Sequence, residues 1–372
     1  MEEEQQDTKH VLSRKQMIAE ETFSISVFNQ SLQTSSSSLN GDFLWFQLFM
    51  EVLLRIGDRE LAKEDLISFA REKYVNDHIE SQKIAEFSTN YTADTAIKWC
   101  TRDSFVYRQL NQALRLRDLN ALYMFRLLII DIYLQLNKMK DAGDNASSLH
   151  YFYRGQAISR IEIERFQQSI GNYIAMNSFL STSSNRQVSL LSMVSYMEQE
   201  EETLFMLGAV FRLLSVVFDN EERMWSVHLQ LCSNDDSELK PVLECLKGNI
   251  EDKTDSYEPA RIMIELGDMV SAEQHPKRFI DRETPNQGTI GGYYMLFGDI
   301  AMQRGDLDEA IDYQRQGLAL KKQYLPANHP YIPYSHNNLG HALRERGDLN
   351  EALQEFKVLQ EFTVNKTNSN LL

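Results

Sequence analysis

The stretch that decides the fold of the C-terminal third occurs twice, as GDLDEA at residues 305–310 and as GDLNEA at residues 347–352. A glycine lies seven residues before each copy, at Gly298 and Gly340. One offset of 42 residues relates all of these positions. A glycine tolerates the backbone angles of a tight turn, and a small alanine side chain lets two helices approach closely. Matching turn positions at a period of about 20 to 50 residues are the signature of stacked helical hairpins, so the sequence predicts a helical repeat region.

The connection between the two copies carries a further signal, LPANHP at residues 325–330. Residues 258–364 resemble tetratricopeptide repeats of the longer form found in kinesin light chains, whose repeats are joined by a segment like this one. Such a connection accounts for a period above the usual ~34 residues. Residues 260–279 resemble a shortened first repeat that lacks the turn glycine and the spacing of the other two. The resemblance implies a region that binds a peptide or protein ligand.

The region before the repeats changes from helical to strand-like patterns. Apolar residues between Asp42 and Arg55 follow a helical period, whereas residues 224–231 alternate as a half-buried strand does. Ser159 and Glu162 have the spacing of a capping box and predict a short helix between these regions. Further helical patterns cover residues 61–74, 94–100, 103–116 and 119–136, a loop covers 137–149, and strand patterns cover 151–153, 173–183 and 203–218, the last divided at Gly208. Helices followed by a sheet predict an α+β domain.

Composition divides the chain into four parts. Residues 1–41 are polar and lack a sustained period, which predicts a disordered tail. Residues 42–232 form the predicted α+β domain, and the acidic residues 233–257 a linker. Residues 258–372 form the all-α repeat region.

The charge balance bears on the classes of partner. The chain has 38 basic and 54 acidic residues and a formal charge of −16, which argues against general affinity for nucleic acid or an anionic membrane. Three cysteines are too few for a disulfide scaffold, and the eight histidines show no metal-ligand spacing. The sequence contains neither an apolar leader nor an apolar stretch of about 20 residues. It therefore predicts no metal, no nucleic-acid partner, no membrane partner and a cytoplasmic location, with secretion as the alternative.

Three polar motifs occur in an informative order within the α+β domain. They are Arg154 with Gly155, the hydroxyl residues Ser181, Thr182 and Ser183, and the acidic residues Glu200 and Glu202. An arginine fork binds a diphosphate in a bidentate manner. On a strand, Glu200 and Glu202 would share one face, and a carboxylate beside an electron-poor ribose stabilises an oxocarbenium-like transition state. Together, these groups suit cleavage of the bond between nicotinamide and ribose in NAD.

The order Arg, Ser-Thr-Ser, Glu-x-Glu is similar to the signature of arginine-specific mono-ADP-ribosyltransferases. The resemblance covers residues 42–232 and includes Trp99, TRDS at 101–104, Tyr107, LN at 110–111 and ALR at 113–115, which are similar to the N-terminal helical part of that family. It implies an ADP-ribosyltransferase-type β-sheet core with N-terminal helices. It also implies NAD as co-substrate, with NADP as the alternative nucleotide, and a protein substrate with an accessible arginine that the repeats would recruit.

The resemblance assigns roles to the first two motifs. Arg154 matches the arginine that holds NAD near its phosphates and its nicotinamide-side ribose, with Gly155 beside it. Ser181 matches the serine that helps to hold NAD and orients the catalytic glutamate. Thr182 and Ser183 complete the predicted NAD-binding set.

The two glutamates complete the predicted site. Glu202 matches the catalytic glutamate that bonds to the 2′-hydroxyl of the nicotinamide ribose, and Glu200 matches the residue that binds the acceptor guanidinium and takes its proton. The family usually places another strand and a loop before this motif, whereas Glu200 follows Ser183 by only 17 positions here. This short connection leaves an alternative function, a catalytically impaired transferase-like scaffold that acts as a repeat-based protein-binding adaptor.

Overall fold

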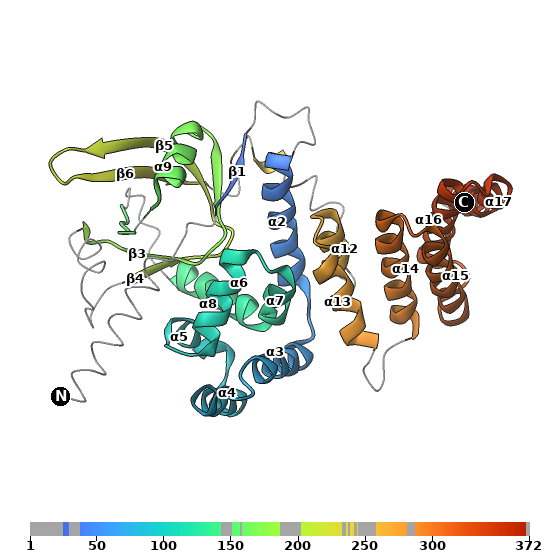
Figure 1. Ribbon diagram of the computed structural model, residues 1–372, viewed down its shortest axis with the longest axis horizontal. Helices are drawn as coiled ribbons and strands as arrows, with labels where there is room; N and C mark the ends of the chain where they lie inside the picture. The colour runs from blue at the N-terminus through green and yellow to red at the C-terminus, as the bar shows by residue number, and fades with distance from the viewer. Residues whose placement is uncertain are drawn as a thin grey trace. The chain divides into compact units, whose positions relative to one another are not determined.

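A computed structural model describes residues 25–29, 38–142, 151–156, 158–186, 202–232, 236, 239–241, 244, 258–280 and 287–369 (Figure 1). The chain divides into two compact units, Met1–Asp252 and Lys253–Leu372. Each unit has a hydrophobic core of its own. The first unit combines helices with two small antiparallel sheets, and the described part of the second is helical.

The first unit begins its helical half at Ser38. The helices are α2 (Ser38–Arg55), α3 (Arg59–Lys73), α4 (His78–Asn90), the 3-10 turn η2 (Ala93–Thr95), α5 (Ala96–Thr101), α6 (Phe105–Leu116), α7 (Leu119–Met124) and α8 (Arg126–Ala142). The starts of α3, α4 and α7 have one local cause. Asp58, Asp77 and Asp118 each accept a hydrogen bond from the backbone N–H three residues later, which satisfies a donor that the first helical turn leaves open.

Two expectations about these helices were wrong. The single helix predicted over residues 119–136 is divided at Phe125 into α7 and α8, and α8 continues to Ala142, into the segment predicted as a loop. Residues 143–150 lie outside the described residues. Helix α4 was not predicted, because only Ile84 and Phe87 supply buried apolar side chains on it and its periodic signal is weak.

Ion pairs join α3 to α8. Arg59 donates from both terminal nitrogens to the two carboxylate oxygens of Asp131, at 2.6 and 2.7 Å, and the Tyr91 hydroxyl donates to the same carboxylate at 2.7 Å. Burial and the Asp131 charge raise the pKa of Tyr91, so this phenol stays a donor. Arg126, with 1% of its surface exposed, pairs with Asp65. A buried charge needs a partner of this kind to offset its desolvation.

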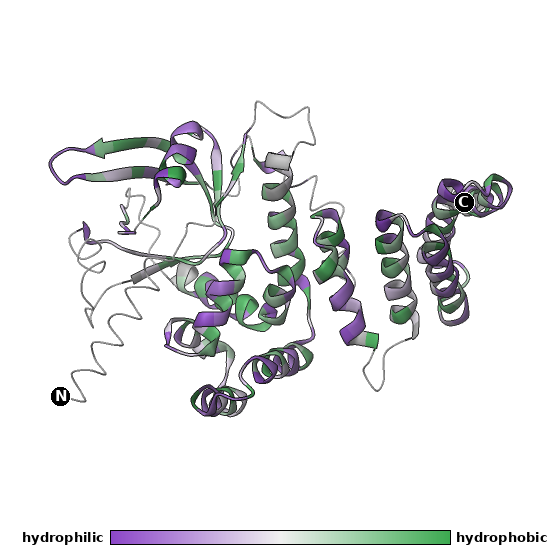
Figure 2. Ribbon diagram, in the orientation of Figure 1, coloured by the Kyte–Doolittle hydropathy of each residue, from purple (hydrophilic) through white to green (hydrophobic). Residues whose placement is uncertain are grey.

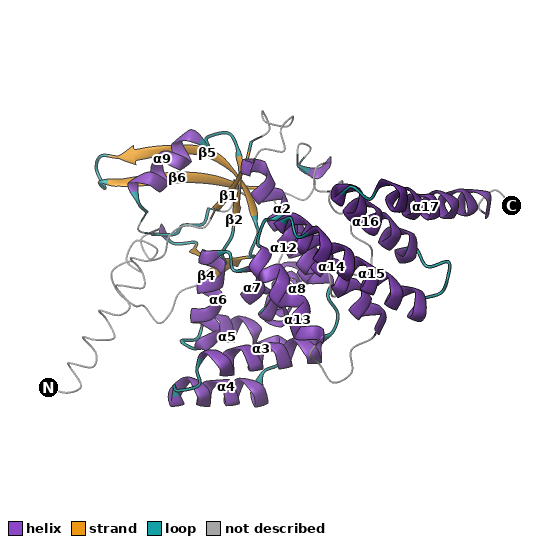
Figure 3. Ribbon diagram, turned by 45° about the vertical axis from the view of Figure 1, so that its right-hand side comes forward, coloured by secondary structure: helices purple, strands orange, loops and turns teal. Residues whose placement is uncertain are grey.

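The larger sheet has the strand order β1-β2-β5-β6, formed by β1 (Ile25–Phe28), β2 (Tyr173–Met176), β5 (Val210–Asp219) and β6 (Met224–Leu231) (Figure 3). Its two faces follow from the alternation of side chains along each strand. Ile174 and Met176 pack on Phe166 of α9 (Arg160–Gln168), whereas Tyr173 and Ala175 pack on Phe43 of α2. Figure 2 shows apolar residues along much of β5 and β6, which form the long hairpin of this sheet. Helices therefore cover the inner part of the sheet on both faces.

The strand predictions for the first unit agree with the structure in part. The strands on either side of Gly208, the strand at 224–231 and the Ser159–Glu162 capping box of α9 are confirmed. The strand predicted over residues 173–183 is instead two strands in different sheets, β2 and β3 (Leu180–Ser183). The aromatic stretch 151–153 forms an isolated bridge at Tyr153 in place of a strand.

Residues 25–29 and 38–41 were wrongly included in the predicted tail. Ile25–Phe28 pairs with β2 as an edge strand, and residues far along the chain hold it in place. Arg117 donates to the Ile25 carbonyl at 3.0 Å, and Asn177 donates to the Ser26 hydroxyl at 2.9 Å. A four-residue strand has too few positions to show a period, so only its partners reveal it.

Part of the predicted linker also belongs to the first unit. Leu239 is buried beside Phe43, and Asp236 accepts a hydrogen bond from the Tyr173 hydroxyl at 3.0 Å. The acidic composition of residues 233–257 suggested a solvated connection, yet these two side chains contribute to the packing of the sheet.

The second unit consists of consecutive antiparallel helices in the part that the structure describes. They are α12 (Glu258–Glu265), α13 (Met269–Ile280), α14 (Gln287–Arg304), α15 (Leu307–Tyr324), α16 (Tyr331–Arg346) and α17 (Leu349–Ser369). Gly267, Gly305 and Gly347 have φ values of 77°, 84° and 101° at the turns between paired helices. Such angles favour glycine. Gly267 is therefore the turn glycine of residues 260–279, and the prediction that this repeat lacks one was wrong.

Close contact between α14 and α15 depends on Gly317. A Cβ atom at this position would lie 2.7 Å from the Gly291 carbonyl oxygen and 2.8 Å from Cγ of Met295. We expect Gly317→Ala to lower the free energy of unfolding of the second unit by about 1 to 3 kcal/mol, because backbone must move to admit the methyl group. Urea denaturation followed by circular dichroism measures this loss. Gly57→Ala is the control, since a Cβ atom at Gly57 meets nothing within 4 Å. Equal effects of the two substitutions would contradict the close approach.

Candidate functional site

Strand β3 lies between Tyr153, which directly precedes Arg154, and the backbone of Glu202, the described part of the third motif. On one edge, the Tyr153 N–H donates to the Ser183 carbonyl at 2.8 Å, and the Ser183 N–H donates to the Tyr153 carbonyl at 2.9 Å. On the other edge, β3 pairs antiparallel with β4 (Glu202–Phe205), and Ser183 stands opposite Glu202 in the register. Segments about 20 to 50 residues apart in sequence therefore meet at one strand.

Arg154 follows the bridge residue directly. Its Nη1 donates to the Ser181 carbonyl at 3.0 Å, and its Nε donates to Oε1 of Gln156 at 2.9 Å. The Arg154 side chain is exposed, whereas Gln156 and Gly155 are half-buried. The structure thus places the predicted phosphate-binding arginine against the backbone of the Ser-Thr-Ser motif.

The three hydroxyl residues have different surroundings. The Thr182 hydroxyl donates to the Thr203 carbonyl at 2.9 Å, and its side chain is buried against β4. The Ser183 hydroxyl accepts from the Asn185 N–H at 3.1 Å, in the turn that leaves the strand. Ser181 is more exposed than either neighbour. Among the three, Ser181 is therefore the most accessible to solvent.

The glutamate motif is described only in part. The backbone of Glu202 lies at the start of β4, opposite Ser183. Glu200 lies outside the described residues, as do residues 187–201 as a whole. The predicted roles of both carboxylates remain predictions.

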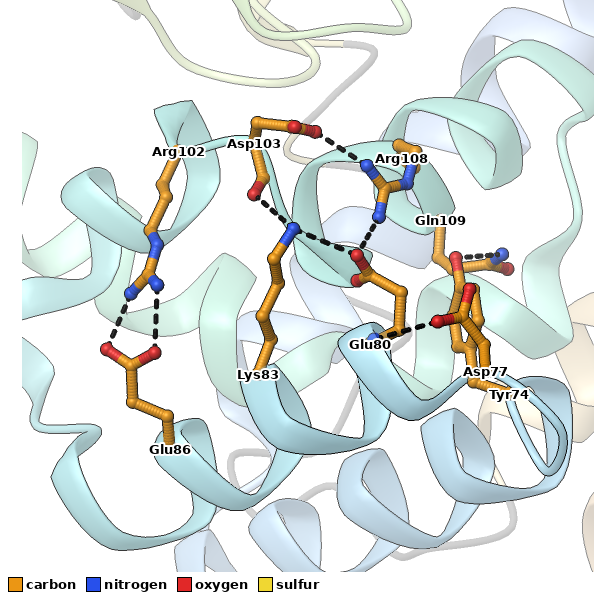
Figure 4. Close-up of polar contacts among 9 residues, drawn as sticks. All are labelled: Tyr74, Asp77, Glu80, Lys83, Glu86, Arg102, Asp103, Arg108 and Gln109. Carbon is orange, nitrogen blue, oxygen red and sulfur yellow. Dashed lines mark hydrogen bonds and ion pairs between the residues drawn. The ribbon is translucent and has the colours of Figure 1, made fainter.

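The TRDS stretch, part of the resemblance to the transferase family, holds helices together (Figure 4). Arg102 donates to both oxygens of Glu86 at 2.6 and 2.8 Å, and its hydrogen bonds hold the pKa of Glu86 below the ordinary value. Asp103 accepts from Arg108 of α6 at 2.6 Å, and its carbonyl accepts from Lys83 of α4 at 3.0 Å. These contacts tie α4 to α6 and to the turn between α5 and α6.

Gln156 is a candidate site residue that the sequence analysis missed. The sequence contains only part of the information that would identify Gln156. A polar residue two positions after an arginine can share its side in an extended segment, but many surface residues do so without contact. The hydrogen bond to Arg154 distinguishes Gln156 from them.

The second unit contains a cluster of polar side chains around Asp299 of α14. The Asp299 carboxylate accepts from Gln314 of α15 at 2.8 Å and from Asn338 of α16 at 3.4 Å. Gln314 is fully buried and also donates to the Met295 carbonyl at 3.1 Å. Gln314 therefore bridges α15 to α14 beneath Gly298, where a Cβ atom would lie 2.7 Å from its amide nitrogen.

Comparison with known families identifies part of this unit. Residues 292–360 match the family model described as tetratricopeptide repeat. The match begins in α14 and ends within α17, and it confirms the repeat prediction over these residues. Tetratricopeptide repeats indicate protein–protein interaction, so this region points to a protein partner. The three motifs between Arg154 and Glu202 lie in the other unit.

No helix in the described part of the chain has both the length and the apolar character needed to cross a bilayer.

We expect the Asp299 carboxyl to make the free energy of unfolding of the second unit depend on pH. Burial raises its pKa from 3.8 to about 7, against the lowering effects of Gln314, Lys321 and Arg261. Between these two pH values, the carboxyl group is protonated in the folded state and ionised in the unfolded chain. The free energy of unfolding should therefore fall as pH rises from about 4 to about 7. Urea denaturation at several pH values measures this slope.

Asp299→Asn should flatten that slope, because an amide keeps the shape of the carboxyl group and does not titrate. Asp312→Asn on the exposed face of α15 is the matched control. An unchanged slope in Asp299→Asn would show that another group causes the pH dependence.

Proposed function

We propose that the protein is an NAD-dependent mono-ADP-ribosyltransferase that modifies arginine side chains of proteins, with its repeats recruiting the protein substrate. The observation that best supports this proposal is the arrangement around β3. Arg154 contacts the Ser181 carbonyl, and Ser183 stands opposite Glu202. An active site like that of the arginine-specific transferases needs these three motifs side by side, although they are far apart in sequence.

The chemistry assigns one task to each group. The guanidinium of Arg154 would bind the diphosphate of NAD through charge-assisted hydrogen bonds. The bond between ribose C1′ and the nicotinamide nitrogen breaks, and its electron pair leaves with nicotinamide, which departs neutral and needs no proton. Positive charge then develops on the ribose, where the Glu202 carboxylate would stabilise it.

The acceptor arginine completes the reaction. Its guanidinium nitrogen forms the new bond to C1′ and loses a proton to Glu200. A free guanidinium has a pKa above about 12, so the proton would leave as the new bond forms. Both carboxylates favour a cationic acceptor, which agrees with arginine as the target.

The short connection before Glu200 is compatible with this proposal. Antiparallel neighbours need only a hairpin connection, whereas parallel strands need a long crossover. Because β3 and β4 are antiparallel neighbours, Glu202 can stand opposite Ser183 without the additional strand that the family usually has.

The tetratricopeptide match favours a second candidate function. A protein-binding adaptor whose transferase-like unit is inactive would need the repeats alone. Titration of NAD into the full-length protein separates the candidates, because the adaptor should bind no NAD. Binding of NAD without transfer to any arginine acceptor would also count against the transferase.

Replacement of Glu202 by alanine should abolish transfer of labelled ADP-ribose from NAD to an arginine-rich acceptor. Loss of one group that stabilises transition-state charge costs about 10²- to 10³-fold in rate. Glu164→Ala on the exposed face of α9 is the control and should transfer at the rate of the unmodified protein. An unmodified protein that neither binds NAD nor transfers its label would refute the proposal.

Replacement of Glu200 by glutamine should reduce transfer to arginine more than hydrolysis of NAD. Hydrolysis uses water as the acceptor and needs no site for a guanidinium. The ratio of labelled acceptor to released nicotinamide measures the difference. Equal losses in the two reactions would contradict the role assigned to Glu200.

A further inference from the structure

The guanidinium of Arg154 is held by two acceptors from different segments. Nε donates to Oε1 of Gln156 at 2.9 Å, and Nη1 donates to the Ser181 carbonyl at 3.0 Å. A guanidinium is planar, and Nε and Nη1 lie at different edges of that plane. Two contacts at different edges fix both the position and the tilt of the group.

The segment that carries these residues is anchored on both sides. Tyr153 exchanges two backbone hydrogen bonds with Ser183 on one side. On the other side, Ser159 is the N-cap residue of α9. Its hydroxyl accepts from the Glu162 N–H at 3.2 Å, and its own N–H donates to the Glu162 carboxylate at 2.8 Å. Gln156 lies between these anchors and is half-buried, so its backbone is held within reach of Arg154.

We propose that Gln156 is a positioning residue for NAD binding. Its carboxamide holds the Arg154 guanidinium in the orientation in which that group binds the diphosphate. This inference rests on the proposed function, because it takes Arg154 as the phosphate-binding group. Gln156 acts through Arg154 and needs no contact with NAD.

The chemistry of a carboxamide suits this role. Its oxygen is a neutral acceptor, so it orients the guanidinium without cancelling the charge that attracts a diphosphate. A carboxylate at the same place would form a charge-assisted pair with Arg154 and compete with the ligand. An arginine already held in place also loses less side-chain freedom when NAD binds.

The expected effect is on affinity for NAD more than on chemistry. Gln156→Met keeps the length of the side chain and removes the carboxamide oxygen. Loss of one such hydrogen bond corresponds to an NAD dissociation constant and a KM for NAD raised about threefold to tenfold, with kcat changed less than twofold. The midpoint of thermal unfolding should stay unchanged. Gln167→Ala on the exposed face of α9 is the control for loss of a surface glutamine.

A double-mutant cycle in the full-length protein tests whether Gln156 acts through Arg154. Arg154→Lys keeps the positive charge and removes the planar fork, so Gln156 has no fork to orient in that background. We expect Gln156→Met to change the NAD dissociation constant less than twofold when Arg154 is already lysine. Calorimetric titration of NAD into the four proteins gives the coupling.

The outcomes separate this inference from the proposed function. A large effect of Gln156→Met in the unmodified background and almost none beside Arg154→Lys supports the inference. Equal effects in both backgrounds, or affinity unchanged by Gln156→Met, overturn it and leave the transferase proposal intact. An unmodified protein that binds no NAD overturns both.

Discussion

Strand β3 has to satisfy its backbone hydrogen bonds on two edges, and this constraint sets the geometry of the candidate site. Tyr153 pairs with it on one side and β4 on the other. The register is further fixed by burial, because Leu180 packs into the hydrophobic core between the larger sheet and α9, next to Phe205. A shift of one residue would expose Leu180 and bury Ser181. The same apolar contact that stabilises the unit therefore keeps Ser183 opposite Glu202.

Polar groups organise both units, although in different ways. In the first unit, Arg59 and Asp131 join α3 to α8, and Arg102 and Glu86 join α4 to the end of α5. In the second, Gln314 crosses beneath Gly298 to reach Asp299 and the Met295 carbonyl. Each contact needs a partner that is distant in sequence, so each one specifies how two helices pack. In the proposed function, the repeats would then present a bound protein at a raised local concentration to the transferase unit.

Local chemistry explains which elements could be predicted from sequence. The turn glycines and the Ser159–Glu162 capping box act within a few residues, and the alternation along β6 shows its period directly. Strand β1 gave no such signal, because its stability comes from β2, Arg117 and Asn177. Leu239 and Asp236 were assigned to a linker for the same reason, since their partners lie some 60 to 200 residues away along the chain.

The sequence by itself determined the repeats at residues 292–360 and most of the helices and strands of the first unit, because side-chain type and spacing carry that information. Only the tertiary structure decided that Tyr153, Ser183 and Glu202 align across neighbouring backbone segments. It alone also showed that Gln156 and the Ser181 carbonyl hold Arg154 between them. The physical reason is that pairing between strands joins residues far apart in the chain, and no local pattern specifies which carbonyl a distant arginine will meet.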